Sequence, residues 1–417
     1  MRLPRWRKSL TVNAASLMTA TVATNLLGLG FWVLAARLKS PVVVGRAAAA
    51  VTALTLLATI SQLNMTNILL RLLPAAGRLS AMLIRRTYLI VAGVAIVVST
   101  GFVLSGPGAR VVTGGWEARA LFAVAVCVLA IFALQDSVLT GLRMAPWVPV
   151  ENASFGAAKL LLLPLLVMIA APGAIVVAAV VPAVIAVLVV TRLLFARVLP
   201  RLRTVEGRLP GRQRLVSFIS GDYVGNVCTT ATVQLMPLLV LWKLGPAPAA
   251  YFTLPWLISM GITFLLWNVA SSFVVETAGA HGQPDTLLRR SLLLWAGVAV
   301  GAMLVCVLGA VPLLSLAGPR YAANGAMLLR LIGLSAPFGA MVAVYSTLAF
   351  LDQRVWLLAA FQGAGGVLML GLTLMLLPRV GLVAGGWASL VTQGLTAAVM
   401  APLALRRVRR GHLVEAL

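Results

Sequence analysis

The sequence is poor in charge, and acidic residues are especially scarce. Only 10% of its 417 residues are charged, with nine Asp and Glu against 33 Lys and Arg, whereas 61% are hydrophobic. Soluble globular domains usually carry about 25% charged residues. This composition therefore excludes a water-soluble globule and predicts an integral membrane protein.

Residues that carry enzyme and metal chemistry are also few. None of the four lysines follows a glycine, so a Walker A loop is absent. The two histidines, His281 and His412, have no Cys or His neighbours, and no two acidic residues lie close together in the sequence. The three cysteines are an odd number within apolar stretches, which argues against a disulfide framework. We expect no enzyme activity, no cofactor and no metal site.

Long apolar runs fill most of the chain. A helix needs roughly 20 apolar residues to cross about 30 Å of hydrocarbon, because its backbone polar groups must be satisfied within the segment. Twelve runs meet this requirement, at about 11–36, 47–70, 87–105, 120–140, 153–171, 174–195, 216–242, 250–275, 291–316, 326–350, 355–377 and 381–405. The sequence predicts an all-α membrane protein with about 12 transmembrane helices.

The distribution of basic residues predicts the orientation. Cytoplasmic loops hold the excess of Lys and Arg, and most of the 33 basic residues fall on one side when the N-terminus is placed inside. Seven arginines lie between Arg192 and Arg214 alone, at the midpoint of the chain. Both termini are then cytoplasmic. Contact with the head groups of membrane lipids accounts for the net charge of +24, so we expect no nucleic-acid partner.

The second half repeats landmarks of the first. Gln62 corresponds to Asn268, Arg85 and Arg86 to Arg289 and Arg290, and the pair Gly106–Pro107 to Gly318–Pro319. Each half has an even number of spans and starts inside, so we predict two pseudo-symmetric six-helix lobes around a central cavity. The predicted divisions are an N-lobe at 1–195, a basic cytoplasmic linker at 196–214, a C-lobe at 215–405 and a basic cytoplasmic tail at 406–417.

Polar residues recur at helical spacing in the first two spans of each half. Such side chains are costly in a membrane unless they face a partner or a water-filled cavity. The sets are Thr52, Thr55, Thr59, Gln62 and Thr66; Asn13, Thr21 and Asn25; Asp222, Asn226, Thr230 and Gln234; and Thr263, Asn268 and Ser272. These stripes are consistent with a polar cavity, and also with helix packing through interhelical hydrogen bonds.

A few charged residues are candidates for binding or coupling. Arg37, Lys39 and Arg46 cluster at the outer end of the first two spans, against the positive-inside rule, where they are suited to grip an anionic group. Arg71, at the inner end of the second span, is either another such ligand or an ordinary anchor. Asp222 is a candidate for a coupling proton or cation, or has a capping role. Lys159 and Arg330, within spans, would be ion-pair partners or snorkel to the interface.

Two stretches resemble a known family. The run from Asn13 to Pro74, with its hinge ARLKSPVVVGRAA and its ending NMTNILLRLLP, resembles the first two helices of polysaccharide and O-antigen flippases. These belong to the multidrug/oligosaccharidyl-lipid/polysaccharide transporter superfamily. Residues 220–260 resemble the opening of the second lobe, although the family's G-x-Y region reads AAYF here, without the glycine. The resemblance implies two lobes that rock around a cationic cavity, with Arg46 and Arg71 placed by location as ligands of a lipid pyrophosphate.

These observations favour a flippase in the cell (plasma or inner) membrane. It would move a lipid-linked saccharide precursor of a surface polysaccharide from the inner to the outer leaflet, with glycosyltransferases or a polymerase of the same pathway as possible partners. Its substrate-binding candidates are Arg37, Lys39, Arg46, Arg71, Gln62, Asn25, Asn226 and Asn268, with Asp222 for ion coupling. The alternatives are an ion-coupled multidrug or cation exporter, for which only Asp222 and Asp136 are available within spans, and a non-transporting scaffold of a glycan-assembly complex.

Overall fold

A computed structural model describes residues 24–169, 173–202, 204, 206–207, 230–279, 284–351 and 355–410. All regular elements within these residues are helical. The chain divides into an N-terminal unit, Met1–Lys39 with Arg46–Gln234, and a C-terminal unit, Ser40–Gly45 with Leu235–Leu417. Asn226 and Asp222, which were predicted as binding and coupling residues, lie outside the described residues.

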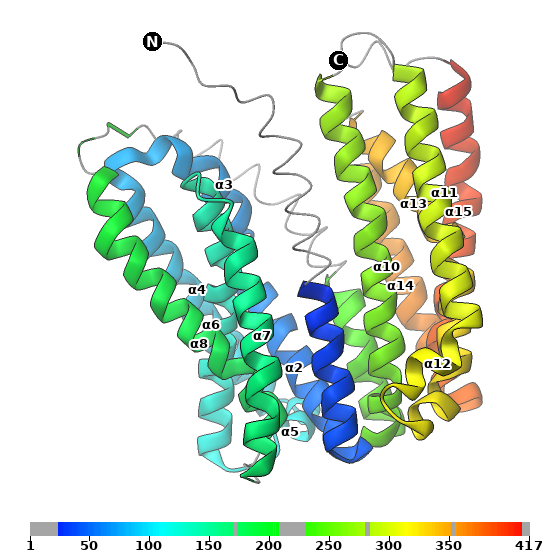
Figure 1. Ribbon diagram of the computed structural model, residues 1–417, viewed down its shortest axis with the longest axis horizontal. Coiled ribbons are helices and arrows are strands. Elements are labelled where there is room, and N and C mark those ends of the chain that lie inside the picture. Colours follow the sequence, from blue (N-terminus) through cyan, green and yellow to red (C-terminus); the bar gives the residue numbers. More distant parts are fainter. Residues whose placement is uncertain are drawn as a thin grey trace. The chain divides into compact units, whose positions relative to one another are not determined.

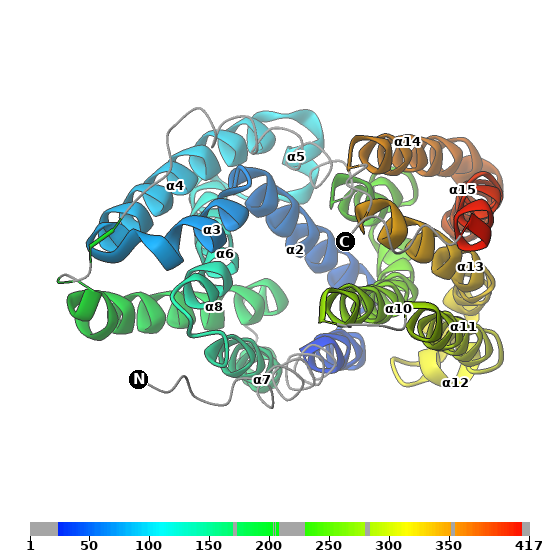
Figure 2. The ribbon, with the colours of Figure 1, turned by 90° about the horizontal axis from the view of Figure 1, so that it is seen from above.

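The N-terminal unit is built around one central helix, α6. The helices of this unit are Thr24–Leu38, α2 (Pro41–Ser61), α3 (Met65–Ala76), α4 (Ser80–Leu104), α5 (Gly106–Val111), α6 (Trp116–Gly141), α7 (Trp147–Met168) and α8 (Ala174–Leu193). Helix α6 contacts α3, α4, α7 and α8 (Figure 2). Val126, Ala130, Leu134 and Val138 are fully buried and step by four, so they form the inward stripe that this central position requires.

The C-terminal unit repeats this arrangement around α13. Its helices are Thr230–Leu244, α10 (Pro246–Gly279), α11 (Pro284–Leu308), α12 (Ala310–Ser315), α13 (Pro319–Leu351), α14 (Val355–Val380) and α15 (Ala384–Arg410), as Figure 1 shows. Helix α13 packs against α10, α11, α12 and α15. Phe252 and Trp256 of α10 stack with ring centroids 5.4 Å apart and share a buried core with Leu328 and Ile332 of α13.

The helix boundaries support the internal duplication. Helices α11 and α12 begin and end 204 residues after α4 and α5, and the helix Thr230–Leu244 lies 206 residues after Thr24–Leu38. The pairing of Gly106 with Gly318 was wrong. Gly106 begins the short helix α5, whose counterpart α12 begins at Ala310, whereas Gly318 precedes the long helix α13. Hydropathy did not reveal this, because α5 directly follows one apolar run and α12 lies inside another.

The chain is a multi-pass membrane protein. Within the described residues, nine helices are long and apolar enough to cross a membrane, and Thr24–Leu38 and Thr230–Leu244 are shorter apolar helices. One of the nine, Ala360–Pro402, covers parts of both α14 and α15. With these two counted separately and the two shorter helices included, the described helices match the twelve spans that the sequence predicts. The second span is interrupted, however, because α2 ends at Ser61 and α3 begins at Met65.

Candidate functional site

A cavity of about 250 Å³ lies inside the N-terminal unit. Five helices line it: Thr24–Leu38, α2, α6, α7 and α8. Its polar lining residues are Thr55, Thr59, Gln62 and Lys159, and the remainder are Phe31, Trp32, Val51, Leu54, Ala58, Leu129, Phe132, Ala133, Phe155, Ala179 and Val180. The cavity is therefore an apolar, partly aromatic chamber that contains a single charged side chain.

That charged group is the Lys159 ammonium of α7. Its Nζ lies 5.2 Å from the ring centroid of Phe31 and 5.1 Å from that of Phe155. Both distances are within the range of cation–π attraction. Among the described residues, no carboxylate lies within ion-pair distance of this ammonium, so the two aromatic rings provide its local stabilisation. An anion that entered the cavity would find a positive charge with no competing counter-ion.

The polar residues of α2 present hydrogen-bond acceptors to the same cavity. The Thr55 hydroxyl donates to the Val51 carbonyl at 2.9 Å, and the Thr59 hydroxyl donates to the Thr55 carbonyl at 2.9 Å. Each hydroxyl therefore uses its only proton within the helix and keeps its oxygen lone pairs for another partner. The Gln62 carbonyl oxygen accepts a 3.0 Å hydrogen bond from Thr66, which leaves the Gln62 amide as a donor.

The interruption between α2 and α3 positions Gln62. Leu63 and Asn64 adopt positive φ angles of 47° and 59°, which end α2 and redirect the chain into α3. The Asn64 side chain accepts a 2.8 Å hydrogen bond from Asn67, and asparagine tolerates this left-handed conformation better than most residues. Irregular backbone within a membrane occurs where it lines a cavity or is buried in protein. The break thus turns the end of a transmembrane helix into part of the cavity wall.

A second polar group lies between α6 and α7. Asn152 donates to both carboxylate oxygens of Asp136, at 3.1 and 3.3 Å. The neighbouring Glu151 is within Coulombic reach of Asp136, and among the described residues both Glu151 oxygens are buried without a hydrogen-bond partner. The contact between Asn152 and Asp136 therefore brings Glu151, the chain neighbour of Asn152, near a second carboxyl group from another helix.

Of the eight residues proposed from the sequence as substrate ligands, Gln62 is the one that lines the cavity within the described part of the chain. Arg37 lies in the last turn of the first described helix, Thr24–Leu38, and Lys39 comes directly after that helix. Arg46 lies within α2 and not in the connection before it, because α2 already begins at Pro41. Arg71 is exposed on α3. The basic residues therefore lie beside the cavity along the chain and do not line it.

The two remaining described candidates have different environments. Asn25 is exposed in the N-terminal unit, and Asn268 is half-buried in α10 of the C-terminal unit. Sequence reasoning had treated Lys159 as an ion-pair or snorkelling residue and had not considered Glu151, because the predicted span began at residue 153 whereas α7 begins at Trp147. The spacing of Glu151, Phe155 and Lys159, each four residues apart, is the signal that would have placed them on one face of a helix.

Comparisons with known proteins agree with this architecture. Residues 10–213, about half of the chain, match the family described as polysaccharide biosynthesis protein. No curated protein matches the sequence. These results, with the solved structures below, confirm the resemblance to the polysaccharide transporters of the superfamily that the sequence suggested.

The chain has the fold of transporters of the MOP superfamily. A multidrug resistance MATE family transporter of this superfamily, in its inward-facing conformation, has a TM-score of 0.67 at 14% identity, with 93% of this chain and 95% of that chain covered. A MATE in complex with MaL6 gives 0.60 at 14%, covering 95% of each chain. A MOP superfamily transporter from Pyrococcus furiosus Vc1, in which reverse polarity of the binding pocket suggests a different function, gives 0.57 at 15%, covering 96% and 94%.

Proposed function

We propose that the protein is a translocase that moves a lipid-linked saccharide precursor of a surface polysaccharide from the inner to the outer leaflet of the cell membrane by alternating access. The observation that carries this proposal is the cavity of the N-terminal unit, whose one charged lining residue is Lys159. A lysine binds phosphate as a point charge. Its ammonium is therefore suited to the phosphate, or an acidic sugar, of an anionic head group.

The other lining groups suit the saccharide part of such a head group. Phe31, Trp32 and Phe155 supply aromatic surface, while Thr55 and Thr59 supply acceptor oxygens for sugar hydroxyl groups. Polar and charged groups that line a cavity have no use in a non-transporting scaffold, where dry helix packing is sufficient. The match of residues 10–213 to a polysaccharide biosynthesis family supports the same substrate class.

The basic residues of the first helices extend this site into a path along α2. Arg46 and the end of α2 at Ser61 are separated by fifteen residues, or about 22 Å of helix. One diphosphate cannot contact both Arg46 and Arg71, which lies further along on α3. The cavity lies along α2 between them, from Val51 to Gln62. We expect Arg71, then the cavity, then Arg46 with Arg37 and Lys39, to contact the head group in successive steps.

Export of cationic drugs is the second candidate, favoured by the MATE-type fold and by the Asp136 and Glu151 carboxyl groups. The charge in the cavity opposes it. A monovalent cation about 5 Å from the Lys159 ammonium would be repelled by about 3 kcal/mol at an effective dielectric constant of about 20. We therefore rank anionic substrates first.

The test is transport of a fluorescent lipid-linked oligosaccharide in vesicles that contain the purified protein. Lys159→Met, which removes the charge and keeps the apolar stem, is expected to abolish translocation, whereas Lys159→Arg keeps part of it. Lys243→Met is the matched control, because Lys243 is an exposed lysine at the end of another helix. Full translocation by Lys159→Met, or uptake of a cationic dye by the unaltered protein with no movement of the oligosaccharide, would contradict the proposal.

A further inference from the structure

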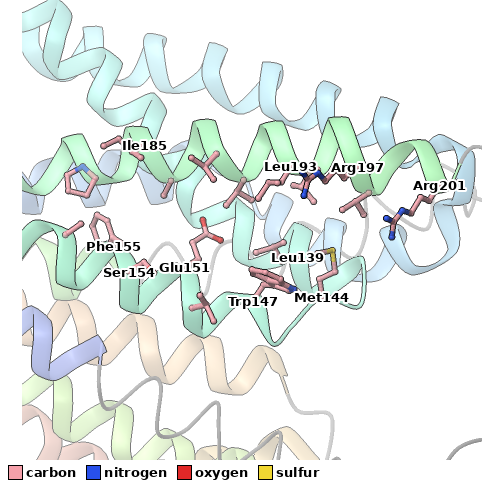
Figure 3. A pocket seen from close by; sticks show the side chains of 18 residues that line it. Leu139, Met144, Trp147, Glu151, Ser154, Phe155, Ile185, Leu193, Arg197 and Arg201 are labelled. Atoms are coloured by element: carbon pink, nitrogen blue, oxygen red, sulfur yellow. The ribbon is translucent and has the colours of Figure 1, made fainter.

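A second and larger cavity, a groove of about 500 Å³, runs between α7 and α8 in the N-terminal unit. Its walls are almost entirely apolar, and the three ionisable lining residues are Glu151, Arg197 and Arg201. Figure 3 shows the two arginines at one end of this groove, Phe155 and Ile185 towards the other, and Glu151 between them. The groove thus has a cationic end and a long hydrocarbon-like body.

The arginines belong to the helical extension of α8. The helix continues beyond Leu193 as a π-helical turn, Leu194–Val198, and a further turn to Leu202. Arg197 and Arg201 are four residues apart, so they lie on one face of these turns, and both are exposed at the groove. Two guanidinium groups on one face can donate several hydrogen bonds to a single phosphate. Basic pockets between transmembrane helices on the cytoplasmic side bind lipid phosphates in other proteins.

The length and polarity of the groove select the ligand. Along α8 the lining extends from Arg197 back to Pro182, fifteen residues or about 22 Å of helix. This is longer than one half of a hydrocarbon core about 30 Å thick. The volume falls within the range of about 300 to 1,000 Å³ that is typical of small-molecule sites.

We propose that the α7–α8 groove binds the single hydrocarbon chain of a lipid whose phosphate is held by Arg197 and Arg201. This inference deepens the proposed function, because it locates the lipid part of the substrate separately from the cavity around Lys159. We infer a lipid with a single hydrocarbon chain, because these two helices form one groove between them. A two-chain phospholipid would have to leave its second chain outside.

The experiment measures lipid binding directly and requires no transport. The purified full-length protein, in discs of a neutral phospholipid, is titrated with a polyprenyl monophosphate, and the bound complex is quantified by native mass spectrometry. We expect Arg197→Gln and Arg201→Gln each to weaken binding about tenfold, equivalent to about 1.4 kcal/mol. Arg192→Gln is the matched control, because Arg192 is an exposed arginine of α8 that does not line the groove. We expect it to bind like the unaltered protein.

A second pair of variants tests the hydrocarbon part. Ala186→Trp places a large ring in the groove and is expected to abolish binding of the polyprenyl monophosphate. Leu188→Trp, on the outward face of the same helix, is expected to have no effect, because Leu188 is 64% exposed. This comparison separates filling of the groove from a general effect of tryptophan on α8.

Three results would overturn the inference. The first is equal weakening by Arg192→Gln and Arg197→Gln, which would indicate a diffuse surface charge. The second is equally tight binding of the uncharged polyprenol or of phosphatidylglycerol, which would indicate a non-selective lipid-facing surface. The third is binding of inorganic phosphate as tight as that of the polyprenyl monophosphate, which would show that the chain does not contribute. If the groove variants bind the lipid normally while Lys159→Met still abolishes translocation, the groove assignment is wrong and the proposed function stands. If the groove variants weaken lipid binding while Lys159→Met translocates normally, the groove assignment stands and the proposed function is wrong.

Discussion

Replacement of Lys159 by methionine should make the protein more stable while it removes the proposed activity. The Lys159 ammonium is half-buried in the cavity and has no ion-pair partner within the described part of the chain. Removal of an ion from water costs several kcal/mol even after the protein relaxes. The attraction to Phe31 and Phe155 returns about 0.5 to 2 kcal/mol for each ring. Because the attraction does not offset the whole cost, the charge is a net destabilising element.

Methionine retains most of the unbranched apolar stem and fills irregular space well. We therefore expect Lys159→Met to raise the free energy of unfolding by about 1 to 2 kcal/mol, less than the full cost of burial because the cavity admits water. The assay is thermal unfolding of the purified protein in detergent, where this change corresponds to a rise in Tm of a few degrees. Lys243→Met should leave Tm unchanged, because Lys243 is an exposed lysine on another helix.

A fall in Tm for Lys159→Met would refute this reasoning. It would mean that the ammonium and its two aromatic neighbours form a structural element that holds α7 against the first helix. Phe155→Leu provides the second measurement, because it removes one of the two rings and leaves the charge. Because the Phe155 ring attracts the ammonium, Phe155→Leu should lower Tm more in the presence of Lys159 than in the Lys159→Met background, and a double-mutant cycle measures this attraction separately from the cost of burying the charge.

Two further predictions concern packing in the C-terminal unit. A Cβ atom at Gly333 would lie 2.6 Å from a side chain of α11, so Gly333→Val should lower the free energy of unfolding by about 1 to 3 kcal/mol. Gly301→Val is the control, because a Cβ atom at Gly301 has no atom within 4 Å, and it should leave the unfolding temperature unchanged in the same assay. The buried Trp295 donates a hydrogen bond from Nε1 to the Leu266 carbonyl at 3.1 Å. Trp295→Phe should lower the free energy of unfolding by about 2 kcal/mol, because the hydrogen bond and part of the buried volume are lost. Trp116→Phe should have little effect, because Trp116 is 78% exposed. Equal unfolding temperatures within either pair would contradict the packing that these distances describe.

The overall fold was predictable because the membrane leaves few solutions. Apolar runs of about 20 residues must become helices in hydrocarbon, and their order and the repeated landmarks gave the two related halves. The short helices α5 and α12 were not predictable. Each is only six residues long and lies within or beside an apolar run, so hydropathy does not separate it from the neighbouring span. This is the reason that the pairing of Gly106 with Gly318 failed.

The site was less accessible from the sequence. The polar stripe of the second span was identified by its spacing, and Thr55, Thr59 and Gln62 of that stripe do line a cavity, whereas Thr52 and Thr66 do not. The break after Ser61 could not be predicted from the sequence, because the residues with positive φ angles are Leu63 and Asn64 and no glycine or proline marks the turn. Lys159 was misjudged because a single lysine in a span does not indicate whether it faces lipid, a carboxylate or a cavity. That distinction depends on Phe31 from a helix distant in the sequence.

The two related halves differ at the helix that lines the cavity of the N-terminal unit. In the C-terminal unit α10 runs without interruption from Pro246 to Gly279 and passes through Asn268, the counterpart of Gln62. In the N-terminal unit the corresponding helix breaks at Gln62, and the next two residues, Leu63 and Asn64, adopt positive φ angles. A positive φ angle at a residue other than glycine costs on the order of 1 kcal/mol. The charge of Lys159, which has no ion-pair partner among the described residues, adds a second cost in the same cavity. The break is not needed for packing, because α10 fulfils the same scaffold role without it. Both costs therefore coincide at the cavity that we propose as the binding site of an anionic head group.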